Sequence, residues 1–306
     1  MTASCDRVRS GLRRRRAAAA WLPAVLLAAP PLASAAGELP RIDATTSLLV
    51  VAPHPDDETL CCAGVIQRVV EAGGRVSIAW ITSGDASTLE MLLVEKRLFA
   101  APRELRALAS RRMEEARAAS SLLGVRSSGQ LFLGYPDRGV LELLTRHYRS
   151  VYTSAFTESA AVPYPDTLAA GHPYTGESLE RDFDAVLTRT RPTLVLAPSP
   201  RDTHPDHEGA ALLTLRALRR RGELGLLRCW IVHGGEGWPS PRGLYPGLPL
   251  SAAPRIPHPA ASSFELTAEE EDRKLAALRA YGTQLEVMAP FLLAFVRTTE
   301  LFWPAP

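Results

Sequence analysis

A strand–helix–strand pattern in residues 48–82 constrains the fold of this chain more than any other feature of its sequence. Residues 48–52 form a short, continuous apolar run that Pro53 stops, which is typical of a strand buried on both faces. Residues 60–72 have a helical pattern that ends at Gly73 and Gly74, and the alternating run 75–82 predicts a second strand. A span of about 35 residues suits one βαβ unit, so the pattern predicts a parallel sheet.

The same alternation continues through most of the chain. We expect helices at 102–123, 178–190, 209–221 and 267–284, the first of them capped by Gly124, and strands at 130–133, 192–198 and 227–232. This order predicts an α/β fold, a Rossmann-like three-layer sandwich with a mostly parallel central sheet. A chain of 306 residues with 46% hydrophobic residues can build one large core or at most two small ones. We therefore predict a single domain over residues 42–306.

Two stretches interrupt the alternation, at residues 135–176 and 234–263, and both are rich in proline and glycine. We predict irregular loops there. Loops of this length in a compact domain often form the walls or lids of a functional site.

The N-terminus has the three parts of a secretory signal. An apolar run at 17–32 is followed by Ala33-Ser34-Ala35 and preceded by six arginines, namely Arg7, Arg9, Arg13, Arg14, Arg15 and Arg16. This arrangement predicts a signal peptide at residues 1–35, cleaved after Ala35, and export to the periplasm or the medium. The alternative is an uncleaved anchor, but prolines interrupt the run, which is short for a span of about 20 residues.

Charge and cysteine content narrow the possible functions. The net charge is +2, and without the N-terminal arginines the chain is close to neutral or acidic, so no nucleic-acid-binding surface is expected. Beyond the signal the cysteines are Cys61, Cys62 and Cys229, without Cys-x-x-Cys spacing. We interpret them as small buried side chains rather than metal ligands.

Two clusters of acids and imidazoles follow predicted strands. His54-Pro55-Asp56-Asp57-Glu58 comes directly after the strand at 48–52, and His204-Pro205-Asp206-His207 follows the strand at 192–198 after a short loop. Ligands of open α/β sheets bind beyond the carboxyl ends of the strands. The two motifs should therefore meet in one crevice.

The residue types in both motifs predict a zinc site. Counting Glu208, the motifs hold five carboxylates and three imidazoles, and charge this concentrated is unfavourable without a cation. Catalytic zinc usually has three protein ligands and an open position, so not all of these groups can be ligands. The excess suits hydrolysis, which requires a base for the attacking water and an acid for the leaving amine.

Together the two motifs closely resemble those of the PIG-L and LmbE-like deacetylases, from about Leu48 to the final helix. The resemblance implies an enzyme with one Zn²⁺ per chain that removes an N-acetyl group from an N-acetylglucosamine-type sugar, glycolipid or glycoconjugate. By similarity the zinc ligands would be His54, Asp57 and His207, and Asp56 would be the general base. His204 would be a protonated imidazole that stabilises the oxyanion or protonates the departing amine, and Asp206 would hold it in its charged form.

Weaker matches to the family suggest substrate contacts. Arg112 stands in an Arg-x-x-Glu pattern with Glu115, and Asp137 ends a Gly-x-x-Asp turn; both are linked to sugar contacts in relatives. For Arg112, a solvated helix face paired with Glu115 is an equal alternative. His233, at the end of the strand at 227–232, could line the same crevice or be a satisfied loop histidine.

Two other functions remain open at the level of sequence. A metal-dependent phosphoesterase would use similar clusters, but it needs two metals and usually a basic phosphate clamp. A non-catalytic carbohydrate-binding protein could keep the fold, although it would have no need for a general base. The expected export favours a glycan, glycolipid or secondary metabolite outside the cytoplasm as the substrate, and the sequence leaves the oligomeric state open.

Overall fold

The computed structural model describes residues 1–2, 38–86, 101–253 and 261–306. The chain divides into a unit of residues Met1–Ala33 and a unit of residues Ser34–Pro306, and the described helices and strands belong to the second unit. The predicted signal peptide lies outside the described residues except for Met1 and Thr2. Among the described helices, none has the length and apolar character needed to span a membrane.

In the described part of the chain, seven strands form one sheet in the order β3-β2-β1-β4-β5-β7-β6. Neighbours among the first five strands are parallel, with Leu48 opposite Val76 and Leu194, whereas β7 is antiparallel to both β5 and β6. The expected mostly parallel sheet is therefore confirmed. The strands are β1 (Ser47–Ala52), β2 (Arg75–Thr82), β3 (Gln130–Tyr135), β4 (Leu194–Pro198), β5 (Leu227–Trp230), β6 (Ser262–Glu265) and β7 (Thr299–Pro304).

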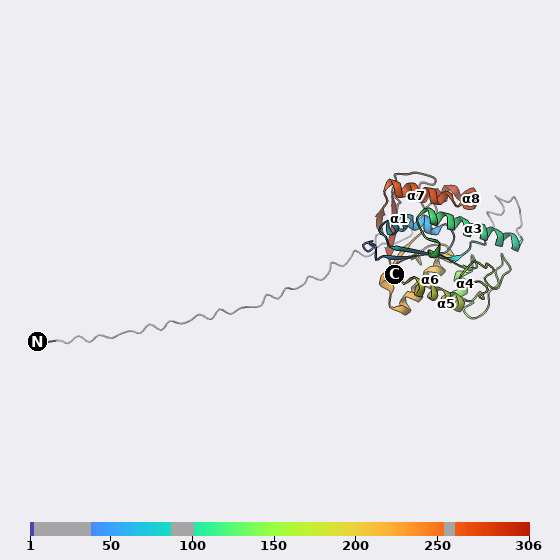
Figure 1. Cartoon of the computed structure of the whole chain (residues 1–306), viewed down its shortest axis with the longest axis horizontal. Helices are drawn as coiled ribbons and strands as arrows, with labels where there is room; N and C mark the ends of the chain where they lie inside the picture. The colour runs from blue at the N-terminus through green and yellow to red at the C-terminus, as the bar shows by residue number, and fades with distance from the viewer. Residues whose placement is uncertain (3–37, 87–100, 254–260) are drawn as a thin grey trace. The chain divides into compact units, whose positions relative to one another are not determined.

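Helices cover both faces of the sheet and complete the predicted three layers (Figure 1). One face carries α1 (Asp57–Glu71), α3 (Pro102–Leu122), α7 (Ala268–Arg279) and α8 (Gly282–Leu292). The other carries α4 (Val140–Thr145), α5 (Gly176–Thr190) and α6 (Pro205–Arg221). Short 3-10 turns lie at η1 (Ser127–Gly129), η2 (Leu224–Leu226) and η3 (Leu293–Phe295).

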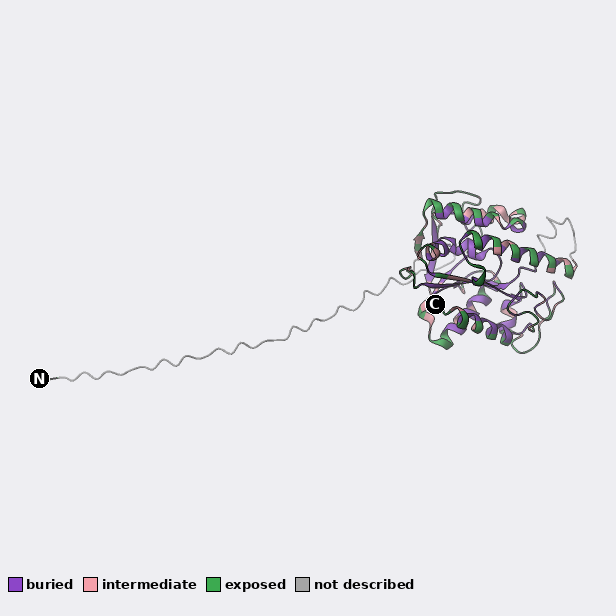
Figure 2. Ribbon diagram, in the orientation of Figure 1, coloured by how far each residue is buried: buried purple, intermediate pink, exposed green. Residues whose placement is uncertain are grey.

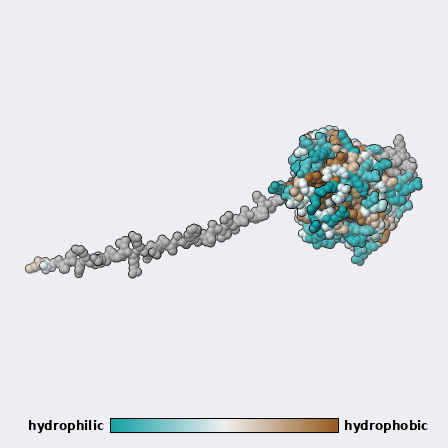
Figure 3. Space-filling model, viewed as in Figure 1, coloured by the Kyte–Doolittle hydropathy of each residue, from teal (hydrophilic) through white to brown (hydrophobic). Residues whose placement is uncertain are grey.

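The central strands lie in the core because helices cover both of their faces. Every residue of β1 and β4 is buried, and Figure 2 shows the buried side of each helix turned toward the sheet. Full burial of an aliphatic side chain such as Val50 or Leu196 stabilises the fold by about 1.5–3 kcal/mol. On the face seen in Figure 3, hydrophilic and hydrophobic residues are interspersed.

The structure corrects several predicted boundaries. Helices α1 and α6 begin at Asp57 and Pro205, three and four residues before the expected starts, because the motif residues themselves form the first helical turns. The expected final helix is two helices, α7 and α8, separated at Ala280 and Tyr281.

The predicted loops also contain regular structure. The stretch 135–176 includes α4, and part of 234–263 lies outside the described residues while its end belongs to β6. The antiparallel pair β6 and β7 was not expected. Residues of β6 alternate between half-buried and exposed, so this short strand lacks the continuous apolar run that identifies the central strands.

Residues of α7 and β7 form hydrogen bonds with backbone groups of α1. Glu300 in β7 accepts the N–H groups of Gly64 (2.9 Å) and Val65 (3.3 Å), and Lys274 in α7 donates to the carbonyl of Leu60 (2.9 Å). Lys274 also pairs with Glu300 at 2.7 Å, and both side chains are buried. The end of the chain is thus tied to the helix that follows the first motif.

All three cysteines beyond the predicted signal are buried, as expected. The sulfur atoms of Cys61 and Cys62 are bonded to each other at 2.16 Å, and Cys229 is a free thiol. Nothing in the spacing of the cysteines predicts this bond.

Candidate metal centre

The first motif forms a tight, buried turn at the carboxyl end of β1. Asp57 Oδ2 accepts the N–H of His54 at 2.9 Å, and the carbonyl of Asp56 accepts the N–H groups of Thr59 and Leu60, both at 3.0 Å. Asp56 has a φ of 121°, a region that residues other than glycine rarely occupy. Such a conformation costs roughly 1–3 kcal/mol and persists only where the surroundings impose it.

The second motif starts α6 at the carboxyl end of β4. His204 is the N-cap residue, and its Nδ1 accepts the N–H of Asp206 at 3.2 Å. Pro205 follows at the first helical position, where its missing N–H and fixed φ are favourable. Since β4 pairs with β1, both motifs reach the same edge of the sheet, and the prediction that they meet is confirmed.

The structure places two of the expected zinc ligands, His54 and His207, next to the carboxylate of the third, Asp57. Asp57 Oδ2 lies 3.3 Å from His54 Nδ1 and 3.3 Å from His207 Nε2. Ligand atoms of a tetrahedral zinc with bonds of about 2.0–2.1 Å would be about 3.3 Å apart. His207 is fully buried, and its Nε2, the nitrogen that faces Asp57, makes no hydrogen bond among the described residues. A metal would supply the partner that a buried imidazole requires, so these residues fit one divalent ion.

Each of the two histidines also faces a second carboxylate. His54 Nε2 lies 3.1 Å from Asp206 Oδ2, and His207 Nδ1 lies 3.1 Å from Asp202 Oδ2. In metal sites a carboxylate on the far nitrogen fixes the tautomer and orientation of a ligating imidazole. The structure therefore brings Asp206 and Asp202 to equivalent places behind the two histidines.

Asp202 is a residue that the sequence did not identify. It is buried and accepts the N–H of His204 (3.0 Å), Val232 (2.9 Å) and His233 (2.9 Å). These bonds join the loops after β4 and β5. The available signal was its place two residues before His204 in the same loop at a strand end.

The expected pairing of Asp206 with His204 is wrong. Asp206 lies in the first turn of α6, and its carboxylate turns toward the loop after β3, where it accepts the N–H groups of Arg138 (2.6 Å) and Val140 (3.0 Å). The contact between His204 and Asp206 is made by the backbone N–H of Asp206 and not by its carboxylate. Burial, followed by the nearby positive charges of His54 and His207, lowers the pKa of His204 to about 2. The charged imidazole expected at His204 is thus not supported by this arrangement.

The pKa values of Asp56 and Asp57 are shifted in opposite directions. Burial, and then the negative charge of Asp57, raises the pKa of Asp56 well above its usual value, although Arg112 opposes the shift. Burial also acts to raise the pKa of Asp57, but the positive charges of His207 and His54 outweigh it, so that pKa lies well below its usual value.

Arg112 belongs to this site and not to a solvated helix face. It is buried, and its guanidinium donates to the carbonyls of Gly84 (2.9 Å) and Pro55 (3.3 Å) and lies 4.0 Å from Asp56 Oδ2. Glu115, its alternative partner, instead accepts the hydroxyl of Thr283 at 2.6 Å.

Asp137 lies at the end of β3, as predicted, with Oδ1 3.4 Å from His54 Nε2. Its Oδ2 accepts the N–H of Ala86 (3.1 Å), and its own N–H donates to Asp85 (3.0 Å). Asp85 also accepts the hydroxyl of Tyr164 at 2.7 Å. Burial, and then the negative charge of Asp137, raises the pKa of Asp85 to about 7.

His233 lies at the site. The sequence left two interpretations of this residue, a crevice residue or a satisfied loop histidine, and the structure favours the first. Its ring centroid lies 4.7 Å from that of His207, and its other face stacks on Phe291 of α8 at 5.7 Å. A cavity of about 240 Å³ opens beside these groups. Its polar and charged wall includes His54, Asp56, Asp57, Arg112, Asp137, Arg138, His204 and His233, and its apolar wall Leu60, Val232, Met288, Phe291 and Leu292.

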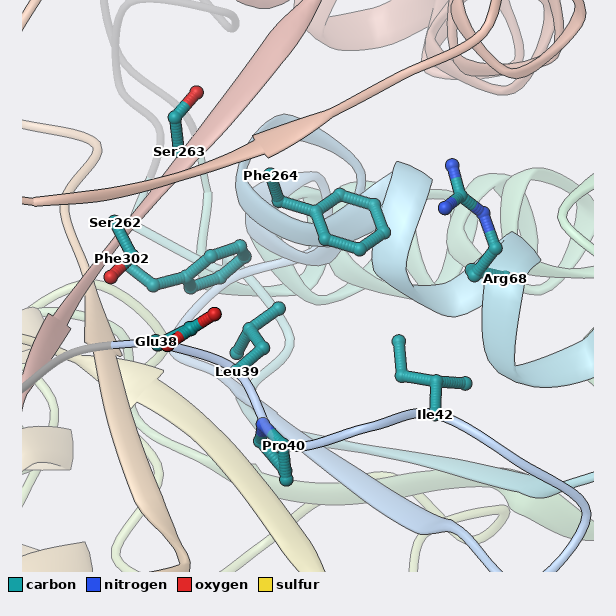
Figure 4. A pocket seen from close by; sticks show the side chains of 9 residues that line it. All are labelled: Glu38, Leu39, Pro40, Ile42, Arg68, Ser262, Ser263, Phe264 and Phe302. Carbon is teal, nitrogen blue, oxygen red and sulfur yellow. The ribbon is translucent and has the colours of Figure 1, made fainter. Parts of the chain in front are cut away.

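A second cavity, of about 310 Å³, lies beside β6 and holds no such chemistry (Figure 4). Apolar side chains, including Leu39, Ile42 and Phe264, form much of its wall. Its one guanidinium, that of Arg68, is held by Glu270 at 2.7 Å. We therefore place the candidate active site at the two motifs.

Comparison with known proteins gives consistent matches. Residues 49–218 match the model of the family described as GlcNAc-PI de-N-acetylase, PIG-L. A 1D-myo-inositol 2-acetamido-2-deoxy-alpha-D-glucopyranoside deacetylase of Geodermatophilus obscurus is 31% identical over 80% of this chain and 84% of its own length. The enzyme of the same name from Acidothermus cellulolyticus is 26% identical over 80% of this chain and 82% of its own.

Among solved structures, the A40926 pseudoaglycone deacetylase has a similar fold, with a TM-score of 0.56 at 20% identity. The match covers 85% of this chain and 96% of that protein. It therefore extends well beyond residues 49–218.

Proposed function

This chain belongs to the GlcNAc-PI de-N-acetylase (PIG-L) family of deacetylases, and from that premise we propose that it uses zinc to remove an N-acetyl group from an N-acetylglucosamine-type sugar, glycolipid or glycoconjugate. One observation carries the choice of metal and ligands. Asp57 Oδ2 lies 3.3 Å from a nitrogen of His54 and 3.3 Å from Nε2 of His207, the spacing of ligand atoms in a tetrahedral site, and this buried Nε2 makes no hydrogen bond among the described residues.

A zinc ion held by these three residues would lower the pKa of a water molecule and polarise the carbonyl of the acetamide. Asp56 is buried beside the ligands and lines the cavity, so it is placed to accept a proton from the attacking water. The water oxygen bonds to the carbonyl carbon, and the C–N bond then breaks. Asp56 returns the proton to the departing nitrogen, which gives a free amine and acetic acid, and the acid then releases its proton to become acetate.

His204 is suited to stabilise the oxyanion. Because its Nδ1 accepts the N–H of Asp206, the proton of the neutral imidazole resides on Nε2. A neutral Nε2–H can donate to oxygen as negative charge develops there, without the charged form that the sequence suggested. Asp206 and Asp202 then act on the metal ligands, by fixing the rings of His54 and His207.

The sugar would bind on the polar wall of the cavity. Arg112 and Asp137 both line it, and Arg138 lies beside them. Guanidinium and carboxylate groups together can donate to and accept from the hydroxyls of a sugar ring. The curated relatives act, by their names, on a 2-acetamido-2-deoxyglucopyranoside, which supports an N-acetylglucosamine-type substrate here.

Acetate release tests the proposal. The purified, zinc-loaded mature chain should release acetate from at least one member of a panel of N-acetylated sugars, glycolipids and peptidoglycan fragments. Metal analysis should give one zinc per chain. Binding without release across the panel would instead favour a non-catalytic carbohydrate-binding protein, and two metals with phosphate release would favour a phosphoesterase.

We also propose that the protein acts outside the cytoplasm. The arginine cluster, the apolar run 17–32 and Ala33-Ser34-Ala35 support this location, although they lie outside the described residues. N-terminal sequencing of the protein recovered from the periplasm or medium should begin at Ala36. Recovery of the full-length chain from the membrane fraction would indicate an uncleaved anchor.

A further inference from the structure

The fifth residue of the first motif, Glu58, is a fully buried carboxylate with no place in the metal centre. Its Oε1 accepts the hydroxyls of Thr59 (2.6 Å) and Tyr281, and its Oε2 accepts Trp80 Nε1 (2.9 Å) and the N–H of Asp56 (3.3 Å). All four donors are neutral groups. They hold the carboxylate in one orientation from four directions.

Two of these contacts connect distant parts of the chain. Tyr281 is buried at the junction of α7 and α8, outside the residues 49–218 that match the family model. This junction is held against both α1 and α3, because Lys274 of α7 donates to the carbonyl of Leu60 in α1 at 2.9 Å and Thr283 of α8 donates to Glu115 of α3. The hydroxyl of Tyr281 therefore meets Glu58 from a fixed direction.

The contact between Glu58 and Asp56 matters because Asp56 is strained. Its φ of 121° is unfavourable for a residue with a side chain, so neighbouring bonds must impose it. Glu58 accepts its N–H, and the first turn of α1 takes up its carbonyl. The direction of the Asp56 carboxylate depends on this backbone conformation.

We propose that Tyr281 and Glu58 are positioning residues for Asp56. The hydroxyl of Tyr281 fixes the carboxylate of Glu58, which fixes the N–H of Asp56 and with it the direction in which the base faces the cavity. The inference rests on the proposed function, in which Asp56 is the general base. It adds that a segment outside the matched family region sets the geometry of that base.

Kinetics of Tyr281→Phe test the inference. This variant removes one hydroxyl from the contact, and we expect kcat to fall by about tenfold to a hundredfold, because small misplacements of a reacting group have effects of this size. KM and zinc content should stay close to wild-type values, since Tyr281 touches neither cavity nor ligands. Unchanged kcat, or a loss explained by lost zinc, would overturn the proposal.

Tyr135→Phe is the matched control. Tyr135 is also fully buried and donates to a carboxylate, that of Asp182, at 2.7 Å. Both variants lose the same atom from the same kind of bond, so their melting temperatures should fall by similar amounts. If Tyr135→Phe lost as much kcat as Tyr281→Phe, the effect would be one of general stability, and the inference would be wrong.

A structural readout separates this inference from the proposed function. Crystal structures of the wild type and Tyr281→Phe should show Asp56 leaving positive φ, or its carboxylate moving away from Arg112, in the variant. An unmoved Asp56 would refute the inference even if acetate release proves the function. Conversely, a wild type that releases no acetate would refute the function, while the two structures still decide whether Tyr281 positions Asp56.

If Tyr281→Phe does not accumulate as a folded protein, Thr59→Ala removes another donor from the same carboxylate. The same fall in kcat at constant zinc content is expected. Full activity in folded Thr59→Ala, together with an unmoved Asp56, would count against the inference.

Discussion

The two motifs have similar composition and the same spacing between their ligand-type residues, yet the molecule supports them in different ways. In the first, His54 and Asp57 belong to a strained turn whose neighbour Glu58 depends on Tyr281, from the C-terminal helices. In the second, Asp202 accepts N–H groups of its own loop and of the loop after β5, the adjacent strand. The first motif depends on helices from the C-terminal part of the chain, whereas the second is held by loops at the same end of the sheet, those after β3, β4 and β5.

This difference separates two tasks. The turn at the first motif places the proposed base and two proposed ligands at once, so it needs an unusual backbone and external support. The second motif holds one proposed ligand and one proposed donor at a regular helix start, which bonds from neighbouring loops can secure. Mutations in the C-terminal helices should therefore damage the first motif more than the second.

The largest expected effect is that of Asp56→Asn. The amide keeps the shape of the side chain but cannot accept the proton, so kcat should fall by about 10²–10⁴. Zinc content should not change, because Asp56 is not one of the three converging ligands. Acetate release and metal analysis of the same sample provide the measurement. Near-normal turnover would show that the base is another residue.

Asp202→Asn tests the local support of the second motif. Removing the negative charge behind His207 should weaken zinc binding by about 10- to 100-fold, the usual range for such partners. Competition with a chromogenic chelator measures the affinity directly. Unchanged affinity would mean that Asp202 serves only to join the loops after β4 and β5.

Asp206→Asn distinguishes the observed contact from the one expected from sequence. If Asp206 acts on His54, zinc affinity should fall, by up to about tenfold, because the N–H groups of Arg138 and Val140 still hold the side chain. If it acts on His204, kcat should fall while zinc affinity is preserved. Zinc affinity and kcat, measured together, therefore show whether Asp206 acts on His54 or on His204.

The last expected effect is on stability and not on activity, and it concerns Asp85, which supports Asp137 on the side of the first motif. Its pKa of about 7 is above that of an unfolded aspartate, so the folded state binds the extra proton between about pH 4 and 7. Stability from this group is present below pH 4 and falls, by at most about 1.4 kcal/mol per pH unit, as the pH rises to 7.

Asp85→Asn should remove this slope and raise the melting temperature at pH 8 relative to the wild type. The amide can still accept from the N–H of Asp137 and can donate to the hydroxyl of Tyr164, which preserves both contacts. Parallel stability curves for the two proteins from pH 4 to 8 would show that Asp85 is ionised throughout.

Sequence alone predicts the central sheet and the meeting of the motifs because both follow from simple rules. Strands buried on both faces, such as β1 and β4, require continuous apolar runs, and parallel order places their carboxyl ends together. The edge strand β6 is only partly buried, so its sequence carries no such run.

Partners of single side chains were less predictable. Asp206 lies two residues from His204, but its rotamer is decided by N–H groups of the loop after β3, which spacing within the motif cannot reveal. Glu58 and Tyr281 are 223 residues apart, and only the packing of α7 and α8 over α1 joins them.

The position of β7 has a consequence for how the protein is made. A growing chain completes both motifs and all five parallel strands before Thr299–Pro304, the strand that covers the edge of β5, leaves the ribosome. Glu300 in that strand also accepts the N–H of Gly64 in α1. We therefore expect chains that stop before β7 to expose the edge of β5 and to depend on chaperones until that strand is added.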